Sequence, residues 1–453
     1  MTFPRYADYK DSGIEWLGEV PAHWEVVSIK RLSPVLRGAS PRPIENPKYF
    51  DDNGIYGWVR ISDVSSSNGY LRETPDILSE LGASLSVKIE PRTLFISIAG
   101  SVGKPCITAR KICIHDGFVY FPLLNMNPIF IFRIFETGEC YAGLGKMGTQ
   151  LNLNTDTIGS IKIAAPPPSE IEIITAFLDH ETGKIDALVA EQEKLIALLK
   201  EKRQAVISHA VTKGLDPSVP LKDSGIEWLG DVPEHWEVKR IKHVVPHIGQ
   251  GWSPEAFDRL AEGNEWGVLK SSCVNHGIFR DTEHKTLPPG VTPPEGLEVL
   301  SGDVLMSRAS GSLDLIGSAA LVENCSFRLI MSDKIFRLEV DQKICFKPFL
   351  VKMLGSPTLR TQITQAISGA EGLANNIGKG AIREFWLPLP PLPEQTAIVA
   401  YLDAQTAKFD TLTAEAERAI ALLKERRSAL ISAAVTGKID VRGFVAPTPQ
   451  EAA

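Results

Sequence analysis

The sequence predicts an α+β protein: two mixed α/β domains separated by a pair of long antiparallel helices, a coiled coil, with an internal pseudo-two-fold repeat. Three observations predict this fold. A short block occurs twice, a helical block occurs twice downstream of it, and the sequence between the copies is divergent and rich in β-formers. The length of 453 residues also exceeds one ordinary hydrophobic core, which indicates several domains.

The repeats have a long period. DSGIEWLGEVPAHWEVVSIK from Asp11 matches DSGIEWLGDVPEHWEVKRIK from Asp223 at 16 of 20 positions, and residues 176–212 match 400–436 at 23 of 37. A period above 200 residues is too long for a solenoid and indicates a duplicated unit. The predicted segments are a first block, an N-terminal domain, a central helix, a linker with the second block, a C-terminal domain, a distal helix and a flexible tail: 1–26, 27–165, 166–214, 215–238, 239–390, 391–440 and 441–453.

The helical blocks carry start, stop and pairing patterns. Ser169 with Glu172 forms a capping-box pattern, and Gly214 and Gly437 predict the two helix ends. Apolar residues at heptad positions predict a stripe on each helix: Ile185, Leu188, Leu195, Leu199 and Val206, then Phe409, Leu412, Leu423 and Leu430. About 30 helical residues, from 183 to 212, would be roughly 45 Å long. An apolar stripe on a helix can also be one side of a larger core. Two matching stripes in one chain, however, favour pairing of the two helices with each other.

The two divergent regions are predicted to have mixed structure. TLFISI (93–98) and DVLMS (303–307) are short β-rich runs, and each region ends in a proline-rich segment that must be extended. RTLFISIAGSVG (92–103) can be laid over GDVLMSRASGS (302–312), and WVRISDV (58–64) over GVLKSSCV (267–274). The two regions are therefore distant versions of one domain.

Composition places limits on partners and compartment. The net charge is −7, yet residues 27–165 hold 15 Lys and Arg against 12 Asp and Glu, and residues 239–390 hold 17 against 16. Basic patches on either domain therefore remain compatible with the acidic total. No apolar run is long enough to span a membrane, and the N-terminus lacks a secretory pattern. Six scattered cysteines suit reduced thiols, so we expect a cytoplasmic protein.

Catalytic motifs are missing from the sequence. GSVGKP (100–105) lacks the spacing of a P-loop, NPIF (127–130) lacks the second proline of the N-P-P-aromatic loop of amino-methyltransferases, and no G-x-G-x-x-G follows a strand. No HExxH occurs, and we interpret His23 and His235 as packing beside the tryptophans that follow them. The sequence therefore predicts a chain without catalytic residues, cofactor or metal site.

At these residues the chain resembles a known family. YKDSGIEWLGEVPAHWEV (9–26), its copy at 221–238, the proline-rich exits and the ALLKExRxAxISxAVT helices are similar to the specificity subunits of type I restriction–modification systems, over essentially the whole chain. The resemblance implies two target-recognition domains that read a bipartite, asymmetric element of double-stranded DNA. It also implies two docked methyltransferase subunits and, through them, nuclease/translocase subunits. S-adenosylmethionine, ATP and Mg would then be needed only in those partners. PSEIE (168–172) departs from the family, whose EQ the second copy keeps in PEQTA (393–397).

A repeated surface in one chain can bind two copies of one partner in equivalent orientations. We hypothesise that the blocks around Trp16 and Trp24, and around Trp228 and Trp236, dock the two methyltransferase subunits together with the helix pair. The alternative is that these tryptophans only pack in the core of their own unit.

Candidate DNA-binding residues are Arg, Asn, Gln, Lys and Ser on loops, since such groups contact base edges and phosphates. In the first domain they are Arg37, Ser40, Arg42, Arg60, Ser62, Gln150, Asn152 and Asn154, with Arg60 preferred. In the second they are Lys270, Ser271, Ser272, Arg308, Ser310, Asn375, Asn376 and Lys379. The alternative for each is a solvated residue or a turn former.

The expected helix length also suggests a spacing rule. Recognition modules on one face of a duplex sit about 34 Å apart, the same order as a helix of roughly 45 Å. We therefore expect several unread base pairs between the two recognised elements. Two rival hypotheses are a single-chain nuclease–methyltransferase, which the missing motifs disfavour, and a coiled-coil scaffold without a DNA role, which leaves two large divergent domains unexplained.

Overall fold

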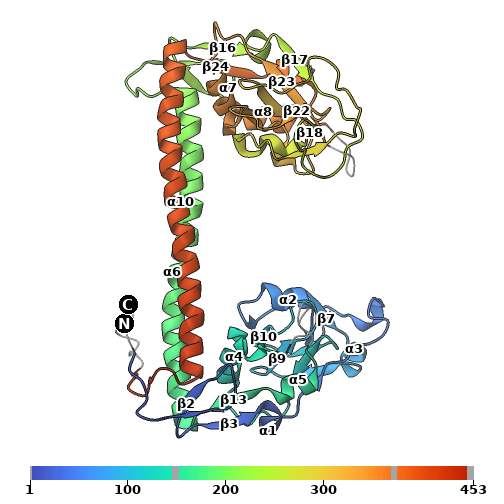
Figure 1. The fold of residues 1–453 in the computed structure, drawn as a ribbon, viewed down its shortest axis with the longest axis vertical. Helices are drawn as coiled ribbons and strands as arrows, with labels where there is room; N and C mark the ends of the chain where they lie inside the picture. Colours follow the sequence, from blue (N-terminus) through green and yellow to red (C-terminus); the bar gives the residue numbers. More distant parts are fainter. Residues whose placement is uncertain (1–2, 145–152, 369–374, 446–453) are drawn as a thin grey trace. The chain divides into compact units, whose positions relative to one another are not determined.

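The computed structural model describes residues 3–144, 153–368 and 375–445, which divide into two compact units (Figure 1). Unit 1 comprises residues 1–193 and 417–453, and unit 2 comprises residues 194–416. Each unit holds one mixed α/β domain and a segment of both long helices, α6 (Pro168–Lys213) and α10 (Leu392–Val435). The predicted class, mixed α/β with two domains and two long helices, is confirmed.

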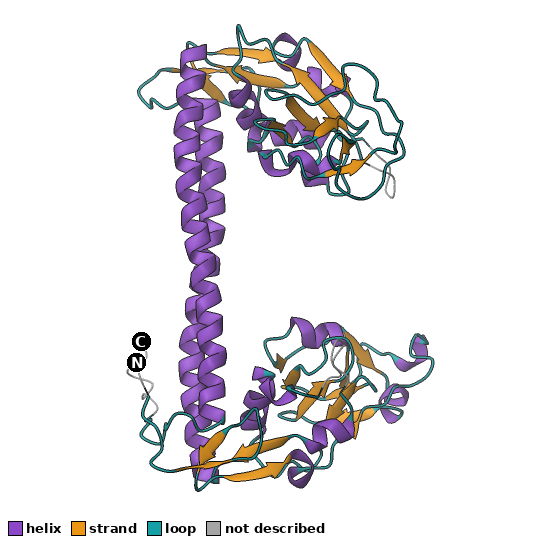
Figure 2. Ribbon diagram, in the orientation of Figure 1, coloured by secondary structure: helices purple, strands orange, loops and turns teal. Residues whose placement is uncertain are grey.

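Unit 1 builds its domain from two main sheets and two short β pairs, with short helices around them (Figure 2). The five-stranded sheet has the order β4 (Leu36–Arg37), β12 (Phe118–Tyr120), β9 (Leu94–Ser97), β10 (Pro105–Thr108), β6 (Tyr70–Leu71). The four-stranded sheet has the order β7 (Asp76–Leu78), β5 (Tyr56–Val59), β11 (Ile112–Ile114), β8 (Val87–Ile89). The pairs are β1 (Tyr9–Asp11) with β2 (Glu19–Pro21) and β3 (Glu25–Ser28) with β13 (Lys162–Ala165). The helices are α1 (Ile29–Leu32), η1 (Pro47–Tyr49), α2 (Ile61–Ser66), α3 (Glu80–Ser84), α4 (Pro128–Thr137), η2 (Glu139–Tyr141) and α5 (Thr155–Ser160).

Unit 2 repeats this plan. One sheet has the order β17 (His247–Gln250), β23 (Ile335–Glu339), β20 (Val304–Ser307), β21 (Ala319–Leu321), and the other β19 (His284–Thr286), β18 (Trp266–Leu269), β22 (Arg328–Ile330). The short pairs are β14 (Leu221–Asp223) with β15 (Asp231–Pro233) and β16 (Glu237–Arg240) with β24 (Trp386–Leu389). The helices are η3 (Ile241–His243), η4 (Ser271–Gly277), η5 (Leu313–Leu315), α7 (Lys347–Leu354), α8 (Pro357–Ala366) and α9 (Lys379–Arg383).

The predicted overlay of the two domains is confirmed by their strand pairing. β9 and β20 occupy the same place in their sheets, and each ends in a fully buried serine, Ser97 or Ser307. In the second sheet, β5 pairs in parallel with β11, as β18 pairs in parallel with β22. Two sequences with little identity therefore specify one topology, and in both domains the central strands, β9 and β20, are buried at every position.

Both long helices lie within the predicted segments 166–214 and 391–440, but the continuous part of α6 is longer than expected. α6 has 46 residues and passes through Gly183, so the expectation of about 30 residues from 183 was too short. The capping box was also wrong, since Ser169 is the second residue of the helix. The Pro167 carbonyl accepts the Glu170 N–H at 2.9 Å, and Pro168 occupies the first position, where its missing N–H costs nothing.

The predicted apolar stripe is only partly buried. Ile185, Leu199 and Phe409 are buried, whereas Leu188, Leu195 and Leu412 are exposed, so those three placements were wrong. A pair of helices buries a narrow seam, and the remaining leucines of a wider apolar face stay in solvent.

Within each unit, the segments of α6 and α10 run antiparallel. In unit 1 the start of α6 and the end of α10 share one hydrophobic core, which contains Ile174 and Ile431. In unit 2 the end of α6 and the start of α10 share another, which contains Val211 and Ile398. Mutual pairing of the helices, predicted from their matching stripes, is confirmed inside each unit.

Each repeated block packs against the end of a helix from the other repeat. The Trp24 ring approaches Gly437, which follows α10, and the Trp236 ring approaches Gly214, which follows α6. Both glycines have positive φ, as helix-ending residues often do. Each unit is therefore assembled from both repeats. None of the helices in the described residues is long and apolar enough to cross a membrane.

Candidate nucleic-acid interface

Three segments of unit 1 meet at the turn of residues 114–117, which joins β11 to β12. The Ala39 N–H donates to the Ile114 carbonyl at 3.1 Å. Val59 pairs with Ile114 in the parallel ladder, so Arg60 follows at the same strand end. The Ile98 N–H donates to the Gly117 carbonyl at 2.8 Å. The candidate segments around Ser40 and Arg60 are thus brought together, although they lie 20 residues apart in the sequence.

Arginines surround this turn and are held by acceptors at the surface. The Arg37 Nε–H donates to the Asp116 carbonyl, and Arg42 Nη2 lies 3.3 Å from Asp116 Oδ2. Arg60 Nε lies 2.5 Å from Asp76 Oδ2. All three guanidinium groups are exposed, and exposed ion pairs contribute little to stability. Arg42 can therefore exchange the carboxylate of Asp116, and Arg37 the carbonyl of the same residue, for a phosphate or a base edge at small cost. Arg60 would have to leave the half-buried carboxylate of Asp76.

Unit 2 collects the equivalent segments at its turn of residues 331–334. The Trp252 N–H donates to the Met331 carbonyl at 3.0 Å, as Ala39 does to Ile114. Val268 pairs with Ile330, so Lys270 follows at the same strand end, as Arg60 does in unit 1. The Arg308 N–H donates to the Lys334 carbonyl at 2.7 Å. Each domain therefore forms its own surface, and the two surfaces have the same backbone arrangement.

A fourth segment joins the unit 2 turn. The Ile377 N–H donates to the Arg308 carbonyl at 3.0 Å, and Ala309 forms a β-bridge with Asn376. Lys379 Nζ lies 5.7 Å from the centroid of the Phe336 ring. The structure thus places Ser310, which follows Ala309 of this bridge, and Asn375, which precedes Asn376, near Lys379.

The remaining candidates have local partners. Ser272 donates to Glu283 Oε2 at 2.6 Å, Lys270 Nζ lies 3.2 Å from Asp258 Oδ1, and Ser271 begins η4. Ser62 follows Arg60 on α2 and is exposed. Asn154 is the N-cap of α5 and accepts the N–H groups of residues 156 and 157, which is the turn-forming role given above as the alternative. Gln150 and Asn152 lie outside the described residues. The DNA contacts of all these residues stay predictions.

One recognition segment was missed by the sequence analysis. QGWSP (250–254) occupies in unit 2 the place of RGASP (37–41) in unit 1, and the shared G-x-S-P pattern would have revealed it. The glycine of this pattern is required because the backbone of the neighbouring turn packs closely against it. A Cβ on Gly38 would lie 2.2 Å from the His115 carbonyl oxygen, and one on Gly251 would lie 2.1 Å from that of Met331.

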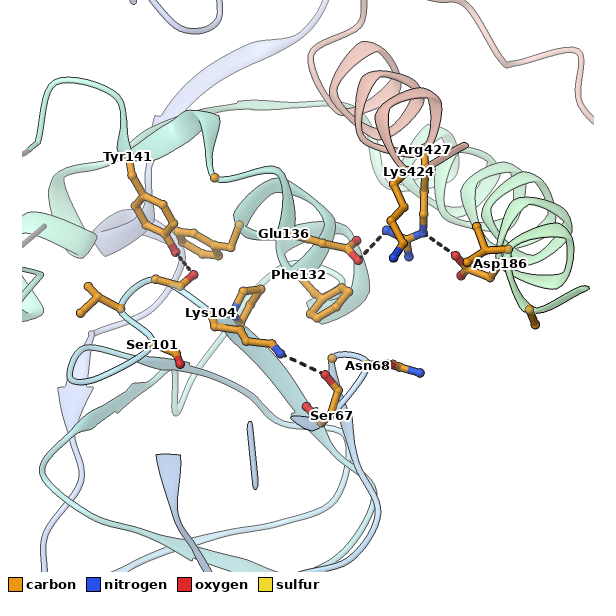
Figure 3. A pocket seen from close by; sticks show the side chains of 18 of the residues that line it. Ser67, Asn68, Ser101, Lys104, Phe132, Glu136, Tyr141, Asp186, Lys424 and Arg427 are labelled. Atoms are coloured by element: carbon orange, nitrogen blue, oxygen red, sulfur yellow. Dashed lines mark hydrogen bonds and ion pairs between the residues drawn. The ribbon is translucent and has the colours of Figure 1, made fainter. Parts of the chain in front are cut away.

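Each domain is anchored by charge to the helix segments of its own unit. In unit 1 the Arg133 guanidinium of α4 is buried and binds Glu136 Oε2 at 2.9 Å and Asp179 Oδ1 at 2.8 Å. Burial alone would lower the pKa of Arg133, but Glu136 and Asp179 outweigh it, and the pKa is raised. Arg427 of α10 binds Glu136 Oε1 at 2.9 Å and closes the network (Figure 3). A pocket of about 830 Å³ lies beside it, lined among others by Lys104, Phe132 and Lys424.

Unit 2 uses a simpler anchor at the equivalent place. Lys352 Nζ of α7 lies 2.8 Å from Asp403 Oδ1, and Asp403 is the repeat counterpart of Asp179. A single ion pair here replaces the network of unit 1.

The tryptophans proposed to dock a partner differ in burial. Trp24 and Trp236 are 0% exposed and belong to the cores of their units, whereas Trp16 and Trp228 are half-buried. Their docking role stays a prediction, but the rings of Trp24 and Trp236 offer no surface to a partner. The histidines beside them bind glutamates: His23 Nε2 lies 2.9 Å from Glu170 Oε2 and His235 Nε2 lies 2.8 Å from Glu394 Oε2.

The departure from the EQ pattern has a local explanation. Gln395 is buried and satisfied by backbone, since its Oε1 accepts the Phe346 N–H at 2.7 Å and its Nε2 donates to the Ile344 carbonyl at 2.9 Å. Ile171, at the equivalent position, packs in the apolar core of unit 1 instead. The amide of Gln395 therefore matches polar backbone groups in unit 2, and the apolar side chain of Ile171 matches the apolar core of unit 1.

Among the described residues, five buried cysteines have thiols of low reactivity. Burial raises the pKa of Cys106 and Cys113 to about 11, and that of Cys140, Cys273 and Cys345 to about 12, so these thiols are protonated at neutral pH. Within residues 3–144, 153–368 and 375–445, no group of three or more His, Cys, Asp or Glu could hold a metal ion.

Comparison with known proteins adds an independent line of support. The family model for the type I restriction modification DNA specificity domain matches residues 21–197 and 233–421. The EcoKI specificity subunit of Escherichia coli is 22% identical over 93% of this chain and 90% of its own length. The putative MjaX specificity subunit of Methanocaldococcus jannaschii is 24% identical over 94% and 96%.

Two further matches differ in extent. The EcoEI specificity subunit of E. coli is 26% identical over 46% of this chain, and that match spans 35% of the relative's length. A chain from a solved structure on complex assembly and conformational transition of the type I R-M system superimposes with a TM-score of 0.67. The superposition covers 92% of this chain and 98% of that one at 17% identity, and it establishes a shared fold.

Proposed function

Because this chain belongs to the family of type I restriction modification DNA specificity domains, we propose that it is the subunit that selects the DNA sequence for such a complex. Its two domains read two short elements of one bipartite, asymmetric target in double-stranded DNA. The observation that carries the proposal is the pair of equivalent turns, residues 114–117 and 331–334, each surrounded by exposed or half-exposed basic and polar side chains.

The turn of unit 1 has the groups that DNA recognition needs. Arg37, Arg42 and Arg60 supply guanidinium groups that can bind phosphates or the guanine edge. In unit 2, Lys270, Arg308 and Lys379 supply the cations, with serine and asparagine side chains between them. Phosphate contacts would set the register of the domain on the duplex, and base contacts would select the sequence.

The asymmetry of the target follows from unlike side chains on a common backbone plan. Arg308 in unit 2 occupies the place of Ile98 in unit 1, since the two N–H groups donate to equivalent carbonyls. A cation and an apolar side chain cannot select the same base edge. The two halves of the target would therefore differ in sequence.

Two methyltransferase subunits are the proposed partners, and exposed leucines on the helices are the proposed docking surface. In unit 1, Leu188 and Leu422 are 46% and 59% exposed; in unit 2, their repeat counterparts Leu412 and Leu198 are 46% and 51% exposed. Leu188 is two residues after Asp186, a rotation of about 200°, so it points away from the side on which Asp186 binds Arg427. Equivalent apolar surfaces in the two units suit two copies of one partner.

The partners would also supply the chemistry. We assign S-adenosylmethionine to the methyltransferase subunits and ATP and Mg to the nuclease/translocase subunits, which would join through the methyltransferases. This chain would contribute sequence selection and assembly.

The test is the methylome of the host strain, read by single-molecule sequencing. Disrupting this gene should remove methylation from one bipartite motif and leave the methyltransferase subunit inactive at that motif. An unchanged methylome would contradict the proposal, and methyl transfer by the purified chain alone would establish the single-chain enzyme instead. Failure of the assembled complex to shift any duplex, random or genomic, would favour the scaffold hypothesis.

A further inference from the structure

The register of the sheets makes Arg37 and Gln250 equivalent residues. Arg37 ends β4 and lies opposite Val119, which lies opposite Ile96. Gln250 ends β17 and lies opposite Phe336, which lies opposite Met306. Ile96 and Met306 each precede the buried serine that ends the central strand. The two side chains therefore leave the same point of the same fold, although one is a cation and the other an amide.

Both side chains are held by the same backbone group. The Arg37 Nε–H donates to the Asp116 carbonyl, and Gln250 Nε2 donates to the Asp333 carbonyl at 3.0 Å. Each aspartate lies two residues before the strand that pairs with the central one. The side chains of both aspartates also bind the loop that follows β4 or β17: Asp116 binds Arg42, and Asp333 binds Ser253. Each contact orients its side chain through one N–H group and leaves the other polar groups of the guanidinium or amide available.

The unused groups differ in chemistry. Among the described residues, no partner engages Nη1 or Nη2 of Arg37, so two parallel donors remain. Gln250 keeps one N–H and its Oε1 acceptor in the same way. In the major groove, two donors match O6 and N7 of guanine, whereas a donor with an acceptor matches N7 and N6 of adenine.

Resting on the proposed function, we propose that this shared position determines specificity: Arg37 selects a guanine in one half of the target, and Gln250 selects an adenine in the other half. The alternative role for either residue is a phosphate contact, which would carry no sequence preference.

The test exchanges the two residues in the intact complex with its methyltransferase. In cells, the methylated motif is read by single-molecule sequencing; in vitro, the purified complex selects duplexes from a randomised library. Arg37→Gln should replace one preferred guanine by adenine, and Gln250→Arg should replace one preferred adenine by guanine in the other half. Each preference should change by about tenfold or more, and every other position of the motif should persist.

Matched controls make the same chemical change elsewhere in each domain. Arg72→Gln removes an exposed arginine from unit 1, and Gln365→Arg adds one to α8 of unit 2. Both control complexes should keep the wild-type motif.

The library selection decides the outcome even where a variant stops methylating. Selection of the wild-type motif by both exchanged variants would overturn the inference, as would a loss of affinity that is equal for all sequences. Those results would leave the proposed function intact. The proposed function fails separately if the wild-type complex selects no bipartite motif at all.

Discussion

The Arg427 Nε–H donates to Asp186 Oδ1 at 2.8 Å, and the residues displaced by one repeat, Arg203 and Asp410, form the same ion pair in the other unit. In each pair the arginine and the aspartate lie on different long helices. The two repeats therefore make equivalent contacts with each other, as is expected of a duplicated unit.

The two ion pairs should differ in their contribution to stability. Arg427 is three-quarters buried and also binds Glu136, so Arg427→Ala should lower the free energy of unfolding by about 1–3 kcal/mol. Arg203 is more exposed and has one partner, so Arg203→Ala should cost about 1 kcal/mol or less. Urea denaturation measures both, with exposed Arg426→Ala as the control. Equal losses for Arg427 and Arg203 would contradict this difference.

Stability should fall as pH rises above about 9, the ordinary pKa of a thiol, because the buried cysteines stay protonated in the folded state. With the pKa of Cys273 raised to about 12, ionisation favours the unfolded chain, by about 1.4 kcal/mol per pH unit above 9. Urea denaturation under reducing conditions between pH 8 and 10 measures this effect. Cys273→Ala should lower stability at pH 8 but flatten the decline with pH. An unchanged slope would assign the decline to other groups.

Charging the exposed leucines should remove methyltransferase subunits one at a time. Leu188→Glu with Leu422→Glu should cost one subunit, and adding Leu198→Glu with Leu412→Glu should cost the second, because each pair lies in one unit. Native mass spectrometry of the co-purified complex counts the subunits. Exposed Leu123→Glu, in the domain of unit 1, is the matched control and should keep both. Two bound subunits after all four changes would place the docking surface elsewhere.

Arg60→Gln should weaken DNA binding by the complex for every sequence if Arg60 contacts a phosphate. The slope of log affinity against log salt should then fall by about 1, because one fewer counterion is released. Titrations at several salt concentrations measure the slope. If the slope stays the same and discrimination at one base pair is lost, Arg60 contacts a base instead.

The helices set the spacing in our proposal, so shortening both should change only the spacer. Deleting one turn from each helix near residues 193 and 417 removes about 5.4 Å, or one to two base pairs. The methylated motif should keep both recognised elements and lose that many unread positions. A change within either element would refute the spacing rule.

Local patterns in the sequence were enough for the repeats, the helical blocks and the β-rich runs. Identity between copies is visible without a structure, and helices and strands have periods that short windows reveal. The start of α6 was misplaced, since Pro168 can begin a helix as well as follow a loop. Arg37, Ser40, Arg42 and Arg60 were proposed from residue type and loop context, and the structure brings their segments to one turn, while their DNA contacts stay predictions. Asn154 could not be distinguished from a helix cap by sequence.

By itself, the sequence determined that this chain is a duplicated mixed α/β protein and which family it resembles. Only the tertiary structure decided that Trp24 packs at the end of α10, that Leu188 is exposed, and that Gln250 stands where Arg37 stands. The reason is physical. Helix and strand periods arise between neighbours in the chain, but strand register and helix pairing are set by packing between residues far apart in sequence.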